Sequence, residues 1–172
     1  MTTIRVVLFT LAAAAAAVPA AGQTPLVHEA IVEAPAEQVW AAFTTAEGLR
    51  SWMAPHVEID LRVGGLMRTN YNASGSLGDP ATITNRLLAF DPQRMLAMQV
   101  SRPPDGLPFP NAIRQMWTVI YFDRVDDRRT RVRSVGLGFT DDPESQKMRA
   151  FFDQGNAATL KALQKRFAAE PR

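Results

Sequence analysis

The apolar residues near the start of the chain follow first a helical period and then a strand period. Residues 30–33 form a short β-like run, and residues 37–43 then place apolar side chains at helical spacing after Pro35, which suits the first position of a helix. A second short helix is expected to begin at Thr45, whose hydroxyl can cap it. From residue 56 the period becomes two, and four side chains are expected to point inward from one strand: Val57, Ile59, Leu61 and Val63.

The strand period continues through the middle of the chain. Gly64-Gly65 predicts a turn, and further strands are expected over residues 66–73, 81–90, 94–101, 114–124 and 130–139. The proline-rich segment 103–110 cannot join a sheet, because proline lacks the N–H that a ladder needs. It is either a lid over a pocket mouth, with Leu107 and Phe109 at its tip, or a solvated connection. Both faces of strand 114–124 are apolar, so it is either a central strand covered on both sides or the contact of a homodimer.

The chain ends in its longest predicted helix. Asp142 is the expected N-cap and Pro143 the first helical residue. Gly155 lies inside this helix at a cost of about 1 kcal/mol relative to alanine, so we expect close packing or a kink there. A stripe wide enough to cover a sheet repeats at helical spacing: Met148, Phe152, Leu160, Leu163 and Phe167.

These elements predict an α+β fold in which a curved antiparallel sheet wraps around the long C-terminal helix, with two short helices after the first strand. The gap between sheet and helix need not be filled, and pockets of this kind are apolar with a few oriented polar groups. Met67, Met98, Met116 and Met148 are expected to surround one interior volume, either as ligand contacts or as ordinary core. Tyr71 shares the parity of Met67, so its ring either packs in the core or presents its hydroxyl to a ligand.

The N-terminal segment has the pattern of a secretory signal peptide. Arg5 precedes an apolar run over residues 6–18, and cleavage is expected after Ala20 or after Gly22. A run of about 13 residues is too short to span a membrane. We therefore predict a signal peptide over residues 1–22, a single domain over residues 23–172 without a membrane span, and a periplasmic or secreted location. The absence of cysteine excludes both a lipid-anchored lipoprotein and disulfides.

The charge balance and the motifs of the chain limit which partners, metals and cofactors are expected. The chain has 19 Lys and Arg against 17 Asp and Glu, and its arginine-rich segment 124–133 is interrupted by aspartates, so no nucleic-acid partner is expected. His28 and His56 are the two histidines, and neither has a partner at metal-ligand spacing. No glycine-rich phosphate loop and no G-x-S-x-G motif occur. We expect neither a metal nor a cofactor.

Short motifs occur in a fixed order over residues 27–168. They are Ala34-Pro35 with Val39-Trp40, Glu47-Gly48-Leu49 with Trp52, Asp60 to Gly65, Phe90-Asp91-Pro92 before Arg94-Met95-Leu96, Thr130-Arg131-Val132, and the helix from Gly155 to Leu163. Together they resemble the SRPBCC (START-like, helix-grip) superfamily, and more narrowly its branch named for activators of the heat-shock-protein-90 ATPase. The resemblance implies the helix-grip fold. Asn156 departs from the tryptophan found in many relatives, which enlarges or rewets the cavity.

Three functions follow as hypotheses, because members of this superfamily include ligand carriers, cyclases and a co-chaperone domain. The leading one is an exported protein that binds a small hydrophobic molecule, with ligand contacts predicted at Trp52, Met67, Tyr71, Met98, Met116, Phe152 and Asn156. The alternative is an enzyme of the cyclase or dehydratase type, in which Tyr71 or an interior arginine polarises a carbonyl. Further polar candidates for such a role are Arg68, Asn85, Arg86, Gln99, Arg114 and Gln115. The third, a co-chaperone module, is disfavoured by the signal peptide.

Overall fold

The protein was analysed as a computed structural model, which describes residues 24–168. The predicted signal peptide lies outside the described residues. The elements, in chain order, are β1 (Leu26–Val32), α1 (Ala36–Thr44), α2 (Ala46–Arg50), β2 (His56–Ile59), β3 (Leu66–Asn70), β4 (Ile83–Asp91), β5 (Met95–Arg102), the 3₁₀ helix η1 (Ala112–Arg114), β6 (Trp117–Arg124), β7 (Thr130–Leu137) and α3 (Pro143–Phe167). This order confirms the predicted α+β architecture.

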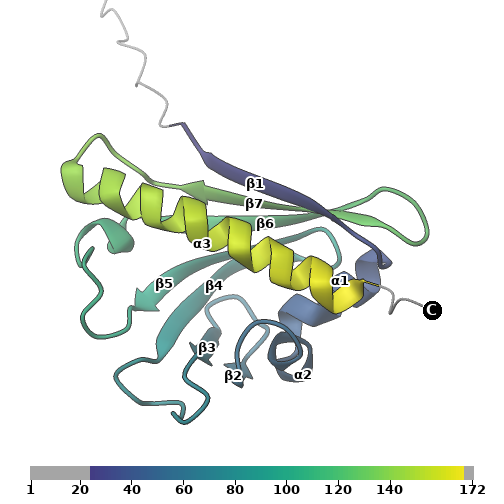
Figure 1. Cartoon of the computed structure of the whole chain (residues 1–172), viewed down its shortest axis with the longest axis horizontal. Coiled ribbons are helices and arrows are strands. Elements are labelled where there is room, and N and C mark those ends of the chain that lie inside the picture. The colour runs from purple at the N-terminus through teal and green to yellow at the C-terminus, as the bar shows by residue number, and fades with distance from the viewer. Residues whose placement is uncertain (1–23, 169–172) are drawn as a thin grey trace, which may run out of the picture.

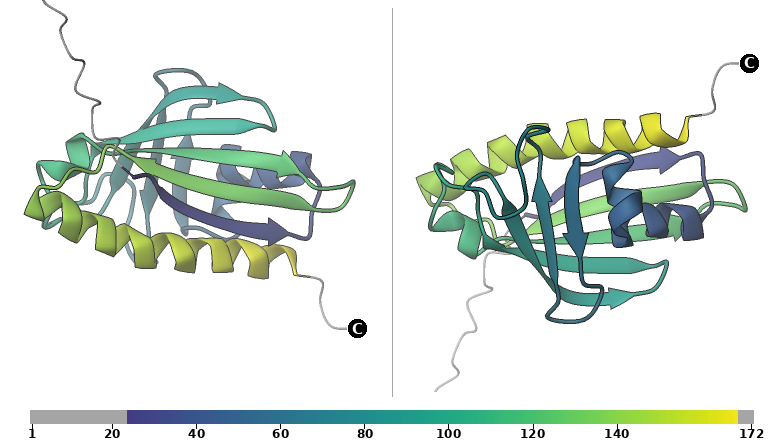
Figure 2. Two further views of the ribbon diagram at one scale, coloured as in Figure 1. Left: turned by 90° about the horizontal axis from the view of Figure 1, so that it is seen from above. Right: turned by 90° about the horizontal axis from the view of Figure 1, so that it is seen from below.

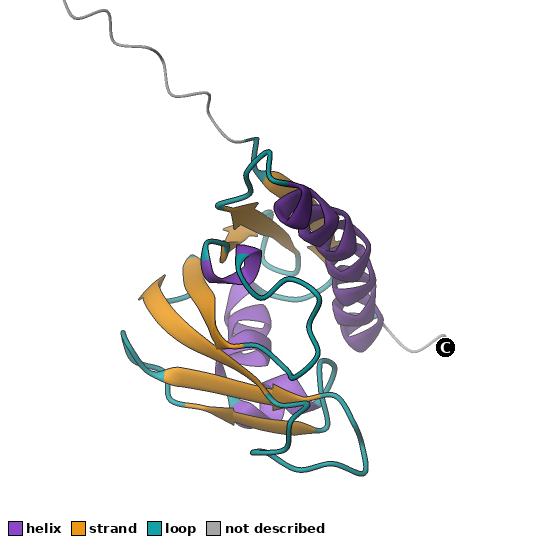
Figure 3. Ribbon diagram, turned by 90° about the vertical axis from the view of Figure 1, so that its left-hand side faces the viewer, coloured by secondary structure: helices purple, strands orange, loops and turns teal. Residues whose placement is uncertain are grey.

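The strands form one seven-stranded sheet in the order β1-β7-β6-β5-β4-β3-β2, and every pair in it is antiparallel. The first strand pairs with the last, from Leu26 opposite Gly136 to Val32 opposite Thr130. Helix α3 runs along the sheet and packs most closely against β1 (Figures 1 and 2). Figure 3 shows that the sheet is curved and that α3 lies beside one end of it. The fold is the helix grip that the sequence predicts.

Local hydrogen bonds explain why the helices begin where they do. The Thr45 hydroxyl accepts from the Gly48 N–H at 2.9 Å, as expected for the cap of α2. The Asp142 carboxylate accepts from the Glu144 N–H at 2.8 Å and caps α3, with Pro143 as its first residue. A Cβ at Gly48 would lie 2.2 Å from the carbonyl oxygen of Ala41. Only glycine therefore fits the corner between α1 and α2.

Two strand boundaries differ from the prediction. Strand β2 ends at Ile59, and Leu61 and Val63, predicted to be buried, are 37% and 63% exposed. After Ile59 the chain turns back on itself, because the Arg62 N–H donates to the Asp60 carbonyl and Gly64 has a positive φ of 80°. The strand predicted from residue 114 begins at Trp117, since the residues before it form η1.

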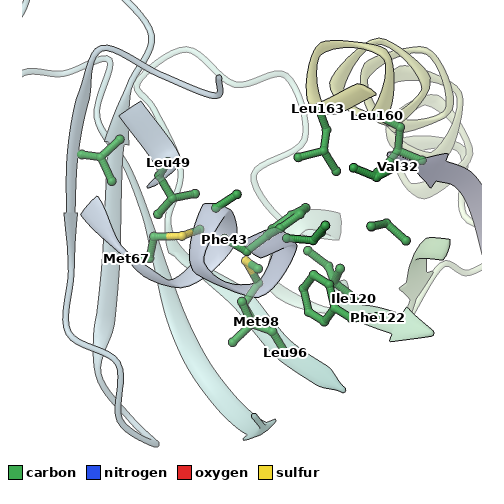
Figure 4. Close-up of a cluster of buried hydrophobic side chains, with 14 of the residues drawn as sticks. Val32, Phe43, Leu49, Met67, Leu96, Met98, Ile120, Phe122, Leu160 and Leu163 are labelled. Atoms are coloured by element: carbon green, nitrogen blue, oxygen red, sulfur yellow. The ribbon is translucent and has the colours of Figure 1, made fainter. Parts of the chain in front are cut away.

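The buried side chains form two separate clusters. The larger lies beneath α1, α2 and the C-terminal half of α3, and Figure 4 shows Leu160 and Leu163 on one side of it with Met67 and Leu49 on the other. The smaller lies beneath the N-terminal half of α3, around Met148. Its buried members are Leu26, Phe109, Ala112, Ile113, Met116, Phe139 and Met148. Helix α3 spans both clusters, and a space lies between them.

Strand β6 lies inside the sheet, between β5 and β7. Its inner face carries the buried Ile120 and Phe122, whereas Trp117 on its outer face is 36% exposed. The first alternative for this strand, a cover on both sides, is therefore incorrect within the described chain. None of the helices within residues 24–168 is long and apolar enough to cross a membrane.

Candidate functional site

A cavity of about 450 Å³ lies where the two core clusters do not merge. Its volume falls within the range of about 300–1,000 Å³ that is usual for small-molecule sites. Side chains from α1, α2, five strands, η1 and α3 form its wall, together with loop 103–107. The lining residues are Phe43, Leu49, Met53, Met67, Thr69, Tyr71, Ile83, Asn85, Met98, Val100, Pro103, Pro104, Leu107, Ile113, Met116, Thr118, Ile120, Val132, Ser134, Phe151, Phe152, Gly155, Asn156, Thr159 and Leu160.

Helix α3 leaves the cavity open because its apolar stripe is interrupted. Between Phe152 and Leu160 the helix presents Gly155, Asn156 and Thr159 to the cavity. A Cβ at Gly155 would meet nothing within 4 Å, so the predicted close packing at this glycine is wrong. The Thr159 hydroxyl donates to the Gly155 carbonyl at 2.8 Å and is satisfied within the helix. Small and polar residues at this point therefore preserve an unfilled volume.

The predicted ligand contacts lie together around this cavity, apart from Trp52. The Trp52 ring stands one layer behind the wall, 4.9 Å from the Phe43 ring, and its Nε1–H donates to the Ala42 carbonyl at 2.9 Å. Phe43 itself lines the cavity. Trp52 was predicted to reach the cavity, because helical spacing cannot tell which of two packed aromatic rings faces the interior. Whether the remaining residues contact a ligand stays a prediction.

The methionines divide between the cavity and the core. Met67, Met98 and Met116 line the cavity, as predicted for a shared interior volume. Met148 is fully buried in the smaller core cluster and does not line it. Ordinary packing therefore accounts for Met148, which points from α3 into the region beside η1.

Tyr71 lies just after the end of β3, at the edge of the cavity. The residue is 56% exposed, so its ring is not a packed core ring. Burial around the phenol raises the pKa of Tyr71 above its usual value. A hydrogen bond with the Thr69 side chain lowers this pKa by a smaller amount. The hydroxyl thus stays protonated over a wide pH range and can donate a hydrogen bond toward the cavity.

Of the other polar candidates, only Asn85 lines the cavity. The Arg68 guanidinium pairs with Glu58 at 3.2 Å on the exposed face of the sheet. Gln99 and Arg114 donate to the backbone carbonyls of Arg114 and Pro110, respectively. Arg86 donates to the Gly64 carbonyl. Among the described residues no arginine lines the cavity, and Gln115 also lies outside the lining.

Sequence reasoning missed part of the wall. Thr118 and Ser134 line the cavity from β6 and β7, and they share the parity of the buried Ile120 and Val132. That alternation was a sufficient signal to find them. Phe151 lies one residue before the predicted Phe152, and its ring centroid is 5.7 Å from that of Phe109. Its place at the wall depends on the fold of loop 103–110, which the sequence does not determine.

The proline-rich loop forms one side of the wall. Pro103, Pro104 and Leu107 line the cavity, and Phe109 is buried in the smaller core cluster. The loop thus joins the wall through these apolar side chains, while Asp105, Gly106 and Pro108 stay exposed. Its end is fastened to α3, because the Glu144 carboxylate accepts from the N–H groups of Asn111 at 2.8 Å and Ala112 at 3.0 Å.

Polar groups from three elements lie beside one corner of the cavity, where Ser134 and Asn156 form part of its wall. His28 on β1 pairs in register with Ser134 on β7, and its Nε2 lies 3.0 Å from Asp153 Oδ1 on α3. Asn156 follows nearly one turn later on α3. Within residues 24–168 no group of three or more His, Asp or Glu side chains is arranged to bind a metal ion.

The comparisons with known proteins agree with this geometry. The family described as Activator of Hsp90 ATPase homolog 1-like protein matches residues 33–168. No protein with a curated description matches the chain. Among solved structures, the Aha1 dimer from Colwellia psychrerythraea has a TM-score of 0.67 at 16% identity, with 84% of this chain and 96% of that chain covered.

Two further structures share the fold. Protein MLL2253 from Mesorhizobium loti has a TM-score of 0.64 at 17% identity, over 83% of this chain and 96% of that one. The di-domain ARO/CYC protein BexL of the BE-7585A biosynthetic pathway has a TM-score of 0.64 at 19% identity, over 84% of this chain and 46% of that one. With its match over residues 33–168, the chain belongs to the family of Activator of Hsp90 ATPase homolog 1-like proteins.

Proposed function

We propose that this protein is an exported binding protein for a small lipophilic molecule. The observation that carries the proposal is the cavity of about 450 Å³ between the two core clusters. Most of its wall is aliphatic, aromatic or methionine side chain, and removing apolar surface from water is the main driving force for binding in such a site. A few hydroxyl and amide groups on the wall supply orientation.

Native mass spectrometry tests this proposal. The protein is purified from its own host, and its mass is measured under native conditions and again after denaturation. We expect the native species to be heavier by the mass of one small molecule, which identifies the ligand class. An identical mass in both states, combined with failure of the purified protein to bind any hydrophobic probe, would contradict the proposal.

Export is the second part of the proposal, and it rests on the N-terminal sequence pattern of residues 1–22. We expect the protein from its host to lack these residues and to be recovered from the periplasm or the medium. Determining the N-terminal residue of the recovered protein distinguishes cleavage after Ala20 from cleavage after Gly22. Recovery of the uncut chain from the cytoplasm would contradict export and would favour the co-chaperone alternative.

An enzyme of the cyclase or dehydratase type is the second candidate function. Tyr71 favours it, because its pKa is raised and its hydroxyl can donate to a carbonyl at the cavity edge. The shared fold with an ARO/CYC protein also supports it. A dehydratase would return its substrate lighter by one water, and the Tyr71→Phe variant would lose this activity while keeping ligand affinity. Recovery of every tested carbonyl ligand unchanged would favour the binding protein.

Association into a homodimer is a further proposal. The outer face of the sheet exposes Trp117 and Val27, and the Aha1 protein of Colwellia psychrerythraea, which shares the fold, was solved as a dimer. Sedimentation velocity should then give a dimer for the wild type and a monomer for Trp117→Lys. A monomeric wild type would contradict it.

A further inference from the structure

Polar side chains gather at one corner of the cavity, between α3 and the β1–β7 edge of the sheet. His28 is opposite Ser134 in the strand register, and its Nε2 lies 3.0 Å from Asp153 Oδ1. Asn156 lies nearly one turn after Asp153, on the same side of α3. Ser134 and Asn156 line the cavity. We call His28, Ser134, Asp153 and Asn156 the polar corner.

The polar corner contains the buried side-chain nitrogens that lack a partner. Across the described part of the chain, the buried side-chain N and O atoms without a hydrogen bond are His28 Nδ1 and Asn156 Nδ2. Native structures rarely leave such atoms unpaired, so each one needs an explanation. The Asn156 amide nitrogen is a donor only, and it belongs to a residue of the cavity wall. What it lacks is a hydrogen-bond acceptor.

The cavity wall also restricts the charge of its occupant. None of the described residues that line the cavity is Asp, Glu, Lys, Arg or His. The polar lining groups are hydroxyls and side-chain amides. An ionised carboxylate or amine moved into this site would lose its hydration without gaining an opposite charge, which is strongly unfavourable. The occupant that fits is uncharged.

We infer that the ligand is an uncharged molecule with an apolar body and one oxygen acceptor, a carbonyl, ether or hydroxyl oxygen, which binds the amide of Asn156. This inference rests on the proposed function and specifies its ligand class. The Ser134 hydroxyl lies at the same corner and can share that oxygen. The contact between His28 and Asp153 joins β1 to α3 nearly one helical turn before Asn156.

A competition experiment with the full chain tests the inference. Diphenylhexatriene, a hydrocarbon probe without any acceptor, reports occupancy of the cavity by its fluorescence. Two competitors with equal numbers of carbon atoms are compared, methyl nonyl ketone and undecanoate, at about pH 8, where the carboxylate is ionised. We expect the ketone to displace the probe at a concentration at least about tenfold lower.

Replacing Asn156 tests whether its side-chain amide binds the oxygen acceptor of the ligand. Asn156→Leu should weaken ketone binding by about tenfold, the usual consequence of one lost hydrogen bond in a buried site, and should leave the affinity for diphenylhexatriene unchanged or higher. Gln154→Leu is the matched control, since it makes the same chemical change at an exposed position of α3 outside the lining. Gln154→Leu should change neither the affinity for the ketone nor the affinity for diphenylhexatriene.

The outcomes separate the inference from the proposed function. If the wild type binds no diphenylhexatriene, both are overturned. If the probe binds but undecanoate competes as well as the ketone, the inference is overturned and the binding function stands. The same holds if Asn156→Leu keeps the ketone affinity of the wild type. The comparison of competitors on the wild type needs no variant, so a folding defect of Asn156→Leu cannot obscure the result.

Discussion

At the scale of single residues, two glycines in helices have opposite reasons for being glycine. A Cβ at Gly48 would collide with the backbone of α1, 2.2 Å from the Ala41 carbonyl oxygen. A Cβ at Gly155 would meet nothing within 4 Å, because this residue borders the cavity. Gly48 is therefore required by the fold, whereas Gly155 leaves space beside the cavity and reduces the stability of α3.

Replacing each glycine by alanine should change stability in opposite directions. Gly155→Ala should raise the free energy of unfolding by up to about 1 kcal/mol, since alanine has the higher helix propensity and nothing obstructs its methyl group. Gly48→Ala is the matched contrast and should lower it by about 1–3 kcal/mol because backbone must shift. Urea unfolding of both variants measures the difference. A destabilised Gly155→Ala would mean that the glycine has a structural role.

Single residues also show where sequence reasoning stops. The methionines Met67, Met98 and Met116 were predicted to surround one interior volume, and all three line the cavity. Helical spacing did not place Trp52 correctly, because the ring of this residue, just after α2, lies where it packs against Phe43. The partnerless amide of Asn156 needs the packing of β1, β7 and α3 at once, which no local pattern contains.

At the scale of elements, the first residues of the helices were easier to predict from the sequence than the last residue of strand β2. Thr45 and Asp142 begin their helices with their own side-chain oxygens, an interaction within three residues along the chain. The end of β2 depends instead on distant hydrogen bonds, because Gly64 and Gly65 pair with Leu87 on β4. Leu61 and Val63 continue the alternation of the strand and were predicted to be buried for that reason. The alternation persists after the hydrogen-bonded strand has ended.

The docking of α3 onto η1 should depend on pH through Glu144. Hydrogen bonds from the N–H groups of Ala112 and Asn111 hold the pKa of the Glu144 carboxyl below its ordinary value. A carboxyl with a lowered folded-state pKa contributes stability above its unfolded pKa and loses it as the pH falls through the folded pKa. Glu144→Gln should therefore be less stable than wild type at neutral pH.

The difference between these two proteins should shrink as the pH is lowered from neutral to below the ordinary glutamate pKa of about 4.3, because the wild-type carboxyl is protonated only below that value. Urea unfolding at a series of pH values measures it. A stability difference that stays constant over this range would show that the carboxylate charge does not stabilise the contact between α3 and η1.

At the scale of the whole molecule, the cavity results from a long helix that spans two separate cores. Leu160 and Leu163 anchor α3 in the larger cluster and Met148 anchors it in the smaller one. The sequence predicted both anchors and the sheet that the helix crosses. It could not predict the volume between them, because that volume depends on the curvature of seven strands and on the path of loop 103–110 over the opening. The hypothesis of an enclosed apolar site thus came from the fold, and its geometry came from the structure.

The most direct test of this account is the affinity for diphenylhexatriene of two variants at adjacent positions of β6. Thr118 lines the cavity, whereas the side chain of Val119 alternates to the opposite face of the sheet. The account predicts that Thr118→Phe fills the cavity and weakens probe binding by at least about tenfold, while Val119→Phe binds like wild type. Both variants should remain folded by circular dichroism. Probe binding that survives Thr118→Phe, or is lost in Val119→Phe alone, would contradict the claim that the ligand binds between the sheet and α3.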